Sequence, residues 1–265
     1  MKIGIFGGAG KMGRMLIAAV LKTKNCELTA VCDVPGSVFI GKDAGDLVGG
    51  GETGVIITDN PLEMFAISDV VIDFSAPSAS TENAVLAAST EKPLVIGTTG
   101  FSDEQQDIIH KASLQAPIVL SPNMSAGVNI LLSIVEKTAA ILDFSYDIEV
   151  LEMHHRNKVD APSGTALALG RAAAKGRGVN LDEAMRASRE GNIGKRLEGE
   201  IGFASLRGGD VVGDHTVIFA ADGERIEFTH KASSREVFAN GAVRAAVWLY
   251  DKPAGLYNMK DVLGL

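Results

Sequence analysis

Cysteine and aromatic residues are scarce in this sequence. The two cysteines, Cys26 and Cys32, are too few for a disulfide framework or a zinc site, so we expect both to be small, reduced, buried side chains. Aromatic residues make up 5% of the chain, and 33 acidic residues outnumber 25 basic ones, giving a net charge of −8. Because nonspecific nucleic-acid binding depends on basic surfaces, we expect no nucleic-acid partner.

Long hydrophobic runs are also absent. No stretch approaches the about 18 unbroken apolar residues of a membrane-spanning helix, and the start of the chain lacks the apolar core of a signal peptide. We therefore expect a soluble, cytoplasmic protein with no membrane partner. With 46% apolar and 22% charged residues, the composition is that of an ordinary globular protein, and 265 residues suffice for one large domain or two modest ones.

The first half of the chain alternates short apolar runs with helical segments. The pattern predicts strands at residues 2–6, 27–33, 70–74, 94–98 and 118–120, and helices at 11–22, 80–88 and 103–114. The strands are continuous apolar runs, which is typical of a parallel sheet covered on both faces. We therefore predict a Rossmann-like, doubly wound α/β domain.

The pattern changes after residue 125. It predicts helices at 128–142, 163–175 and 235–250, strands at 147–154, 201–206, 211–220 and 225–230, and a mobile loop rich in glycine and charge at 186–200. The Asp222-Gly223 pair between the last two strands is a strong hairpin signal. These features predict an α+β domain with a mixed or antiparallel sheet.

Glycine is abundant, with 30 residues, and it concentrates first in the turn after the first predicted strand. Gly8, Gly10 and Gly13 match G-x-G-x-x-G, and Gly7 gives a second, overlapping glycine pattern. Such glycines let backbone N–H groups approach a pyrophosphate at a helix N-terminus. Asp33 follows twenty residues after Gly13, where an acid that binds the cofactor ribose is expected. We predict a dinucleotide site, the alternative being a simple glycine turn.

The residue after the predicted ribose acid bears on the choice of cofactor. A carboxylate at Asp33 accepts hydrogen bonds from the ribose hydroxyls of NAD and repels the 2′-phosphate of NADP. Val34 follows it, so no adjacent arginine is available for that phosphate. The sequence therefore predicts a preference for NADH over NADPH. NADPH remains open if a basic residue reaches over, the candidates being Lys11, Arg14 and Lys42.

Two further polar turns end predicted strands of the same sheet. One is a glycine turn at residues 97–100, and the other runs from Ser121 to Met124. Because ligands of open parallel sheets bind at the carboxyl ends of the strands, both turns are positioned to line the nicotinamide. Taken alone, each could equally be a connector.

A basic cluster occupies residues 154–158, between an apolar strand and the start of a helix. Neighbouring histidines on a strand point to opposite faces, so His154 and His155 are expected to act differently. Ser163 can cap the helix, whose first N–H groups, with Lys158, would bind a small dianion. An imidazole or ammonium beside it can deliver a proton. No metal-ligand spacing is present, and a solvated charge run is the alternative reading.

At these residues the sequence closely resembles the 4-hydroxy-tetrahydrodipicolinate reductase family, also called dihydrodipicolinate reductases, of bacterial diaminopimelate and lysine biosynthesis. The most specific match is the run His-His-Arg-x-Lys-x-Asp-Ala-Pro-Ser-Gly-Thr-Ala at 154–166, and other matches lie at 7–13, 43–45, 97–101, 207–210, 213–215 and 255–257. The resemblance implies that His154 and Lys158 are catalytic proton donors and that His155, Gly164 and Thr165 bind the carboxylates of a small dicarboxylate substrate. It implies nucleotide binding by Gly7, Gly8, Ala9, Gly10, Lys11, Met12, Asp33, Gly97, Thr98, Thr99, Ser121, Pro122, Asn123 and Met124.

The resemblance also implies a domain organisation and a reaction. Residues 1–125 and 235–265 would form the dinucleotide-binding domain, and 126–234 a substrate-binding domain that joins subunits into a homotetramer. The implied reaction is hydride transfer from NADH or NADPH to C4 of the dehydrating substrate. Some family members carry an arginine directly after the ribose acid, where this sequence has Val34. This departure bears on the choice between NADH and NADPH and not on the reaction. Another two-domain dehydrogenase and a non-catalytic nucleotide-sensing protein are the alternatives.

Overall fold

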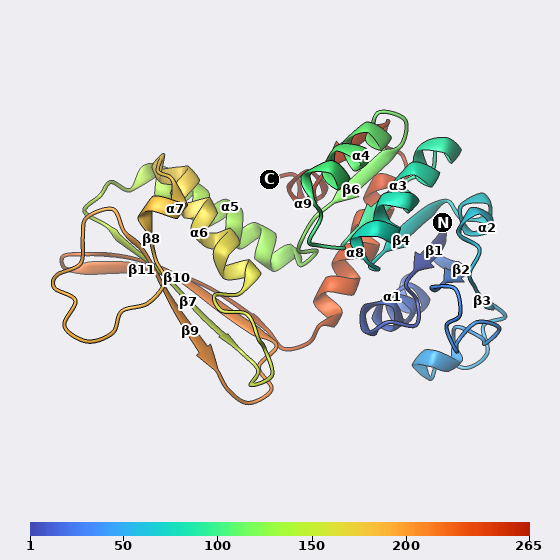
Figure 1. Ribbon diagram of the computed structural model, residues 1–265, viewed down its shortest axis with the longest axis horizontal. Coiled ribbons are helices and arrows are strands. Elements are labelled where there is room, and N and C mark those ends of the chain that lie inside the picture. The colour runs from blue at the N-terminus through green and yellow to red at the C-terminus, as the bar shows by residue number, and fades with distance from the viewer. The chain divides into compact units, whose positions relative to one another are not determined.

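The computed structural model describes all residues, Met1–Leu265, and divides them into two compact units (Figure 1). Unit 1 comprises Met1–Ala126 and Glu236–Gly264, and unit 2 comprises Gly127–Arg235 together with Leu265. The chain therefore leaves the first unit, completes the second and returns. No helix in the structure is both long and apolar enough to cross a bilayer.

Unit 1 is built on a seven-stranded parallel sheet of order β12-β6-β5-β4-β1-β2-β3. Its strands are β1 (Lys2–Phe6), β2 (Glu27–Cys32), β3 (Ile57–Thr58), β4 (Val70–Asp73), β5 (Leu94–Ile96), β6 (Pro117–Leu120) and β12 (Gly255–Tyr257). Successive apolar side chains of one strand enter different cores: Val70 and Ile72 of β4 join one, and Val71 joins the other. Burial on both faces explains the continuous apolar runs.

Helices cover both faces of this sheet, as predicted for a doubly wound domain. One face packs α1 (Lys11–Lys22), α8 (Glu236–Leu249) and α9 (Met259–Leu263), and the other packs α2 (Pro61–Ile67), α3 (Pro77–Thr90) and α4 (Asp103–Ser113). A short 3₁₀ helix, η1 (Asp46–Val48), contacts α1. The predicted α/β fold class is therefore confirmed.

The sequence analysis did not predict several short elements of unit 1. They are η1, β3, α2, β12 and α9, none longer than seven residues. Segments this short carry too few residues for a periodic hydrophobic signal, although the Asn60 N-cap and Pro61 mark the start of α2. The predicted strand at 27–33 was one residue too long, and the predicted helix at 80–88 was too short, since α3 begins at Pro77.

Unit 2 contains a mixed five-stranded sheet of order β11-β10-β7-β9-β8. Its strands are β7 (Asp147–His154), β8 (Met185–Arg186), β9 (Ile201–Arg207), β10 (Gly213–Ala221) and β11 (Glu224–Ala232). β7 pairs antiparallel with β10 and parallel with β9, and β10 and β11 form the predicted antiparallel hairpin. The expectation of an α+β unit with a mixed sheet is confirmed.

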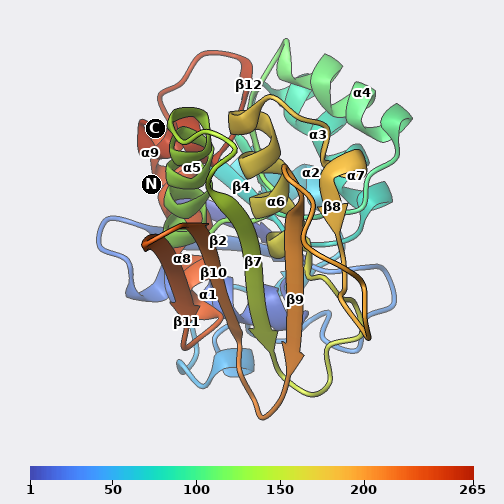
Figure 2. The ribbon, with the colours of Figure 1, turned by 90° about the vertical axis from the view of Figure 1, so that its left-hand side faces the viewer.

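Helices pack against only one face of the sheet in unit 2. α5 (Ala126–Ile141) and α6 (Gly164–Arg177) share its apolar core, and α7 (Leu181–Ala184) contacts α6. Figure 2 shows the five strands in front of these helices, with no helix over the opposite face. That face, called the open face below, carries the even-numbered residues of β9 and β10 and the odd-numbered residues of β7.

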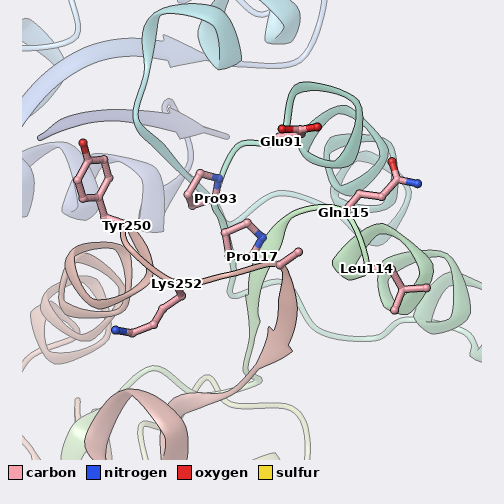
Figure 3. A pocket seen from close by; sticks show the side chains of 8 residues that line it. Glu91, Pro93, Leu114, Gln115, Pro117, Tyr250 and Lys252 are labelled. Carbon is pink, nitrogen blue, oxygen red and sulfur yellow. The ribbon is translucent and has the colours of Figure 1, made fainter.

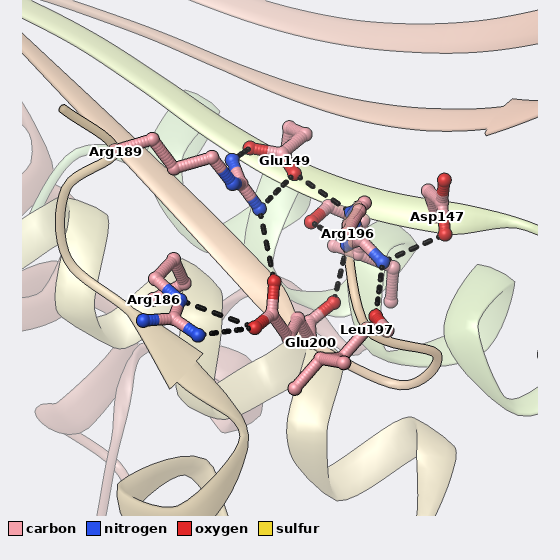
Figure 4. Close-up of polar contacts among 8 residues, drawn as sticks. Asp147, Glu149, Arg186, Arg189, Arg196, Leu197 and Glu200 are labelled. Atoms are coloured by element: carbon pink, nitrogen blue, oxygen red, sulfur yellow. Dashed lines mark hydrogen bonds and ion pairs between the residues drawn. The ribbon is translucent and has the colours of Figure 1, made fainter. Parts of the chain in front are cut away.

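The glycine- and charge-rich segment that was predicted as a mobile loop has irregular backbone from residue 187 to 200. Arginines of this segment nevertheless form ion pairs with carboxylates of the sheet (Figure 4). Arg189 makes a two-point contact with Glu149 at 2.8 and 2.9 Å, and Arg196 contacts both Glu149 and Asp147. Arg186 binds Glu200 at 2.8 Å. This ion-pair network accounts for the arginines of the segment, which the sequence had predicted only as a mobile loop.

Candidate functional site

The glycine turn between β1 and α1 is a compact backbone loop. Gly7 has φ +77°, a conformation that favours glycine. The N–H groups of Gly7 and Gly8 both donate to the Cys32 carbonyl oxygen, at 2.9 and 3.0 Å, and the Gly10 N–H donates to the Gly7 carbonyl. The turn is thereby held against the carboxyl end of β2.

Close packing explains two of the glycines, and the start of α1 suits an anion. A Cβ on Gly8 would lie 2.1 Å from Cγ1 of Val31, and a Cβ on Gly13 would lie 2.1 Å from the Gly7 carbonyl oxygen. Gly10, the N-cap of α1, supplies no side-chain hydrogen bond to the helix. Because the first N–H groups of a helix have no partner within it, this terminus fits the pyrophosphate of a dinucleotide.

Asp33 follows directly after β2, where the sequence predicted a ribose-binding acid. Its Oδ2 accepts a hydrogen bond of 2.6 Å from the Ser37 hydroxyl, and its N–H donates to the Thr58 carbonyl at 3.0 Å. Val34 is 55% exposed and offers no charge for a second phosphate. The position predicted for the ribose acid is therefore a carboxylate followed by a neutral, exposed side chain.

Two of the cations that could reach a 2′-phosphate lie on an aromatic ring. The Arg14 guanidinium is 5.0 Å from the Phe39 ring centroid, and the Lys42 ammonium is 5.1 Å from it. Arg14 also donates to the Ala9 carbonyl at 3.0 Å. Both side chains are therefore already engaged beside the loop that follows Asp33.

The two further turns follow β5 and β6. A Cβ on Gly97 would lie 2.1 Å from the Phe74 ring, so only glycine fits there. The Thr98 hydroxyl accepts hydrogen bonds from the Ser80 hydroxyl at 2.8 Å and the Ser75 N–H at 3.1 Å. After β6, Ser121 N–H donates to the Ile96 carbonyl. Thr99, Pro122, Asn123 and Met124 complete these turns, and Met124 is buried.

Strand register brings the candidate cofactor residues of unit 1 to one edge of the sheet. Phe6 is opposite Cys32 and Asp73, and Asp73 is opposite Ile96, which is opposite Leu120. The residues that follow these strand ends are the glycine turn, Asp33 and the turns beginning at Gly97 and Ser121. They therefore lie at the carboxyl ends of adjacent parallel strands, where doubly wound sheets bind ligands.

One buried carboxylate at this edge escaped prediction. Asp73, the last residue of β4, is fully buried and accepts hydrogen bonds from the Ser75 N–H, the Ser75 hydroxyl and the Asn83 amide at 2.9, 2.6 and 3.0 Å. Burial raises the pKa of Asp73 despite these bonds. The available signal was an acid that ends an apolar strand, as Asp33 follows β2.

In unit 2, His154 ends β7 and is buried in a cluster of polar side chains. Its Nδ1 is 2.5 Å from Oε2 of Glu152, which is 1% exposed. Arg207, at the end of β9, donates two hydrogen bonds of 2.8 Å to the two oxygens of the same carboxylate. His154 and Glu152 share the buried face of β7, because residues two apart on a strand point the same way.

His215 of β10 adds a second imidazole to this cluster. Its ring makes an edge-on contact with that of His154, with the centroids 5.0 Å apart, and its Nε2 is 3.1 Å from the Ser163 hydroxyl. The Ser163 hydroxyl accepts the Ala166 N–H at 3.2 Å and so caps α6, as predicted. His215 was not among the residues predicted for the site, but it is buried and lies against the candidate catalytic residue.

The pKa values of the three titratable groups in this cluster are shifted from their ordinary values. Burial alone would raise the pKa of Glu152, but hydrogen bonds from Arg207 and His154 lower it to about 2. Burial lowers the pKa of His154 against the opposing effect of Glu152. Burial, followed by the nearby His154, lowers the pKa of His215 to about 4. At neutral pH the cluster therefore holds an ionised Glu152 and a neutral His215.

The remaining predicted residues of unit 2 lie in the turn after β7 and at the start of α6. The Lys158 ammonium is 2.8 Å from the Asp160 carboxylate, and its charge acts on His154. His155 Nε2 is 3.4 Å from the Arg235 guanidinium, and its buried Nδ1 has no hydrogen-bond partner. Gly164 and Thr165 form the first turn of α6, and a Cβ on Gly164 would meet no atom within 4 Å.

Neither Glu152 nor Arg207 was among the residues predicted for the site. The buried positions of β7 are Ile148, Val150, Glu152 and His154. An acid in a row that is otherwise apolar was the signal that could have identified Glu152. No group of three or more His, Cys, Asp or Glu side chains in the chain is placed to hold a metal ion.

A cavity of about 640 Å³ in unit 1 lies away from these residues (Figure 3). It is lined by Pro93 and Pro117, at the amino ends of β5 and β6, and by residues that include Tyr250 and Lys252. The amino ends of parallel strands are opposite the edge that carries the glycine turn. The cavity therefore takes no part in the candidate cofactor site.

Comparisons with known proteins identify relatives over the whole chain. Two family models match, described as dihydrodipicolinate reductase, N-terminus, over residues 1–124, and dihydrodipicolinate reductase, C-terminus, over residues 127–263. A 4-hydroxy-tetrahydrodipicolinate reductase from Dinoroseobacter shibae is 52% identical, with 98% of this chain and 97% of the relative covered. One from Beijerinckia indica is also 52% identical, covering 100% and 98%.

Solved structures share the fold. A dipicolinate-bound dihydrodipicolinate reductase from Paenisporosarcina sp. TG-14 matches with a TM-score of 0.77 and 25% identity, covering 97% of each chain. A probable dehydrogenase from Thermotoga maritima matches with a TM-score of 0.61 at 10% identity, covering 99% of this chain and 92% of its own. The second likeness shows the fold alone.

Proposed function

This chain belongs to the dihydrodipicolinate reductase family, and we propose that it reduces 4-hydroxy-tetrahydrodipicolinate with NADH or NADPH. The substrate gains a hydride and a proton and loses its hydroxyl group as water, giving tetrahydrodipicolinate for diaminopimelate and lysine synthesis. The observation that carries the proposal is the 52% identity, over the full chain, to relatives of that name. We propose a cytoplasmic location, since the reaction consumes a reduced nicotinamide.

We propose that unit 1 binds the cofactor and that NADH is preferred. The uncapped start of α1 and the glycine turn would hold the pyrophosphate, Asp33 the ribose, and the turns beginning at Gly97 and Ser121 the nicotinamide. The bound cofactor supplies the hydride to C4 of the substrate. The carboxylate of Asp33 with the neutral, exposed Val34 supports the preference for NADH.

We propose that unit 2 binds the two substrate carboxylates. An arginine can only donate, so the contact with Arg235 makes His155 Nε2 an acceptor and leaves the proton on Nδ1. That buried N–H has no partner and would donate to a carboxylate. Gly164 and Thr165 would add the N-terminus of α6, which favours anions, and Lys158 would add a full positive charge.

We propose His154 and Lys158 as the groups that supply protons. Burial lowers the pKa of His154 below its ordinary value, so its charged form gives up a proton more readily than a free imidazolium does. Lys158, 21% exposed, lies close enough to His154 for the two charges to interact. Proton transfer by such groups is typically worth about 10²–10⁴ in rate.

We also propose that the chain forms a homotetramer through the open face of unit 2. Paired strands place apolar side chains side by side on that face: Leu151 beside Ala204, and Met153 beside Leu206. Leu206 is 48% exposed, and Ile218 of β10 lies on the same face. Burial of these apolar side chains of the open face between subunits would remove them from water.

The test is oxidation of NADH and NADPH in parallel, with substrate made in situ from pyruvate and aspartate semialdehyde by the upstream synthase. We expect turnover that depends on the synthase. Lys158→Ala and His154→Ala should each lower kcat by about 100-fold or more while leaving cofactor affinity unchanged. Lys175→Ala is the matched control, because Lys175 also pairs with a carboxylate in unit 2, at 2.6 Å from Glu136.

Two outcomes would contradict the proposal. Folded wild-type protein that binds NADH but turns over neither cofactor would favour the nucleotide-sensing protein. Full turnover in both the Lys158 and His154 variants would reject the assigned residues and leave the reaction itself in place.

A further inference from the structure

Glu152 is a buried carboxylate with no role in the proposed reaction so far. It is 1% exposed, yet it contacts four donor atoms of three residues: the two Arg207 nitrogens at 2.8 Å, the Ser163 N–H at 3.3 Å and Nδ1 of His154 at 2.5 Å. An ionised carboxylate can only accept hydrogen bonds. The proton of this last contact therefore lies on Nδ1 of His154.

We propose that Glu152, clamped by Arg207, is a positioning residue for His154: it fixes the tautomer that leaves Nε2 to exchange the proton and stabilises the charged ring. This inference rests on the proposed function of His154 as a proton donor. A carboxylate that orients an imidazole through Nδ1 is a general device of acid–base sites.

The surroundings hold both side chains in one geometry. Arg207 also donates to the Asp160 carbonyl at 2.6 Å, so the guanidinium is anchored at a second point. The edge-on contact with His215 restrains the His154 ring on another side. A Cβ on Gly213 would lie 3.0 Å from Nε2 of His154, so the glycine leaves that nitrogen uncrowded. Glu152, bound by Arg207, therefore holds the His154 ring at Nδ1, and Nε2 has room to exchange a proton.

The charged groups around His154 show how the Glu152 carboxylate affects the protonation of the imidazole. Four groups act on His154: Glu152 from its own strand, Lys158 from the next turn, Arg207 from β9, and His215 from β10. Burial and the two cations lower the pKa of His154, and Glu152 alone among these groups raises it. Without the negative charge, the imidazolium would face two cations uncompensated, so less of it would exist near neutral pH.

The activity test is Glu152→Gln, which keeps the side-chain shape and removes the charge. We expect kcat near neutral pH to fall by about tenfold or more, and the alkaline limb of the kcat–pH profile to move about one pH unit lower. The matched control is Glu149→Gln. Glu149 lies on the same strand and also binds an arginine at two points, but on the open face, so the pH limb should stay in place.

A double-mutant cycle separates positioning from structural support. In a His154→Ala background, Glu152→Gln should change kcat by less than about twofold, because the two residues act as one unit. An equal loss with and without His154 would overturn the inference, as would an unchanged pH limb in the single variant. If wild-type protein shows no turnover, the proposed function fails first, and the following measurement still decides the role of Glu152.

Nuclear magnetic resonance of histidine-labelled wild-type protein reads the tautomer without any reaction. The His154 signals are identified by their loss in His154→Ala. We expect neutral His154 with its proton on Nδ1 and a His154 pKa that falls by about one unit in Glu152→Gln. A proton on Nε2 in the wild type would overturn the inference, even if the Glu152 variant does not fold.

Discussion

A Cβ on Gly13 would lie 2.1 Å from the carbonyl oxygen of Gly7 and 2.6 Å from Cα of Gly8. All these atoms belong to backbone, so no side-chain rotation can relieve the contact. The first turn of α1 and the glycine turn are thereby packed together as one rigid piece. Any side chain at Gly13 must move the atoms that we propose to hold the pyrophosphate.

Gly13→Ala should therefore weaken NADH binding by about tenfold or more, which corresponds to about 1.4 kcal/mol. The measurement is calorimetric titration of NADH into folded protein. Dipicolinate binding, which we assign to unit 2, serves as the control and should be unchanged. Wild-type affinity for NADH in this variant would show that the cofactor does not use the turn.

The cofactor preference should respond to the residue after Asp33. Wild-type protein should have a higher kcat/KM for NADH than for NADPH. Val34→Arg should raise kcat/KM for NADPH by about tenfold, since a charge-assisted hydrogen bond contributes about 1.5–3 kcal/mol and this position is exposed. Val38→Arg adds the same charge at another exposed position of the loop and should change little. A wild-type KM for NADPH well below that for NADH would contradict the preference.

Asp73→Ala should destabilise unit 1. The substitution removes the acceptor of the buried Asn83 amide and of the Ser75 hydroxyl, whereas the Ser75 N–H keeps the Thr98 hydroxyl at 3.1 Å. A buried unpaired donor costs about 1–3 kcal/mol. Removal of the desolvated charge offsets part of this cost, so we expect a loss of about 2 kcal/mol in urea denaturation. Asp69→Ala, which removes a single contact with the Lys2 N–H, should cost less. Equal stability of the two variants would contradict the importance of the buried network.

Stability should fall on acidification in two stages. The pKa of His215 drops from 6.5 to about 4 in the folded protein, so its contribution is present above pH 6.5 and is lost as the pH falls to about 4. The pKa of Glu152 drops from 4.5 to about 2, so its contribution is lost between those values. Urea denaturation at pH 7, 5.5 and 4.5 measures the free energy of unfolding, and in His215→Gln this free energy should decrease less between pH 7 and 4.5 than in the wild type. An equal decrease in the two proteins would contradict the assignment.

Leu206→Asp should dissociate the proposed homotetramer. A charge among the apolar side chains of the open face would have to be buried between subunits, which is unfavourable without a partner. Light scattering during gel filtration measures the mass. Ile141→Asp is the control, because Ile141 is 80% exposed and belongs to the end of helix α5, not to a strand of the open face. A wild-type monomer, or a Leu206 variant of unchanged mass, would reject this interface.

The relation between sequence and structure differs between the two units. In unit 1, the glycine turn and Asp33 were recognisable because their signals are local: fixed spacing after an apolar strand. Asp73 was not, because its role depends on the Asn83 amide, which reaches the carboxylate only through folding. In unit 2, the run at 154–158 was recognisable, but Arg207 lies 55 residues from Glu152, and no local pattern joins them.

The sequence by itself determined the two fold classes, the glycine turn, the basic cluster and the resemblance to the family, because periodicity and motif spacing are local properties of a chain. Only the tertiary structure decided which groups surround His154. Parallel pairing of β7 with β9 sets His154 opposite Arg207, and antiparallel pairing of β7 with β10 sets Glu152 opposite His215. Strand register is fixed by the packing of the whole sheet, so it is the fold that brings these distant residues into one charged cluster.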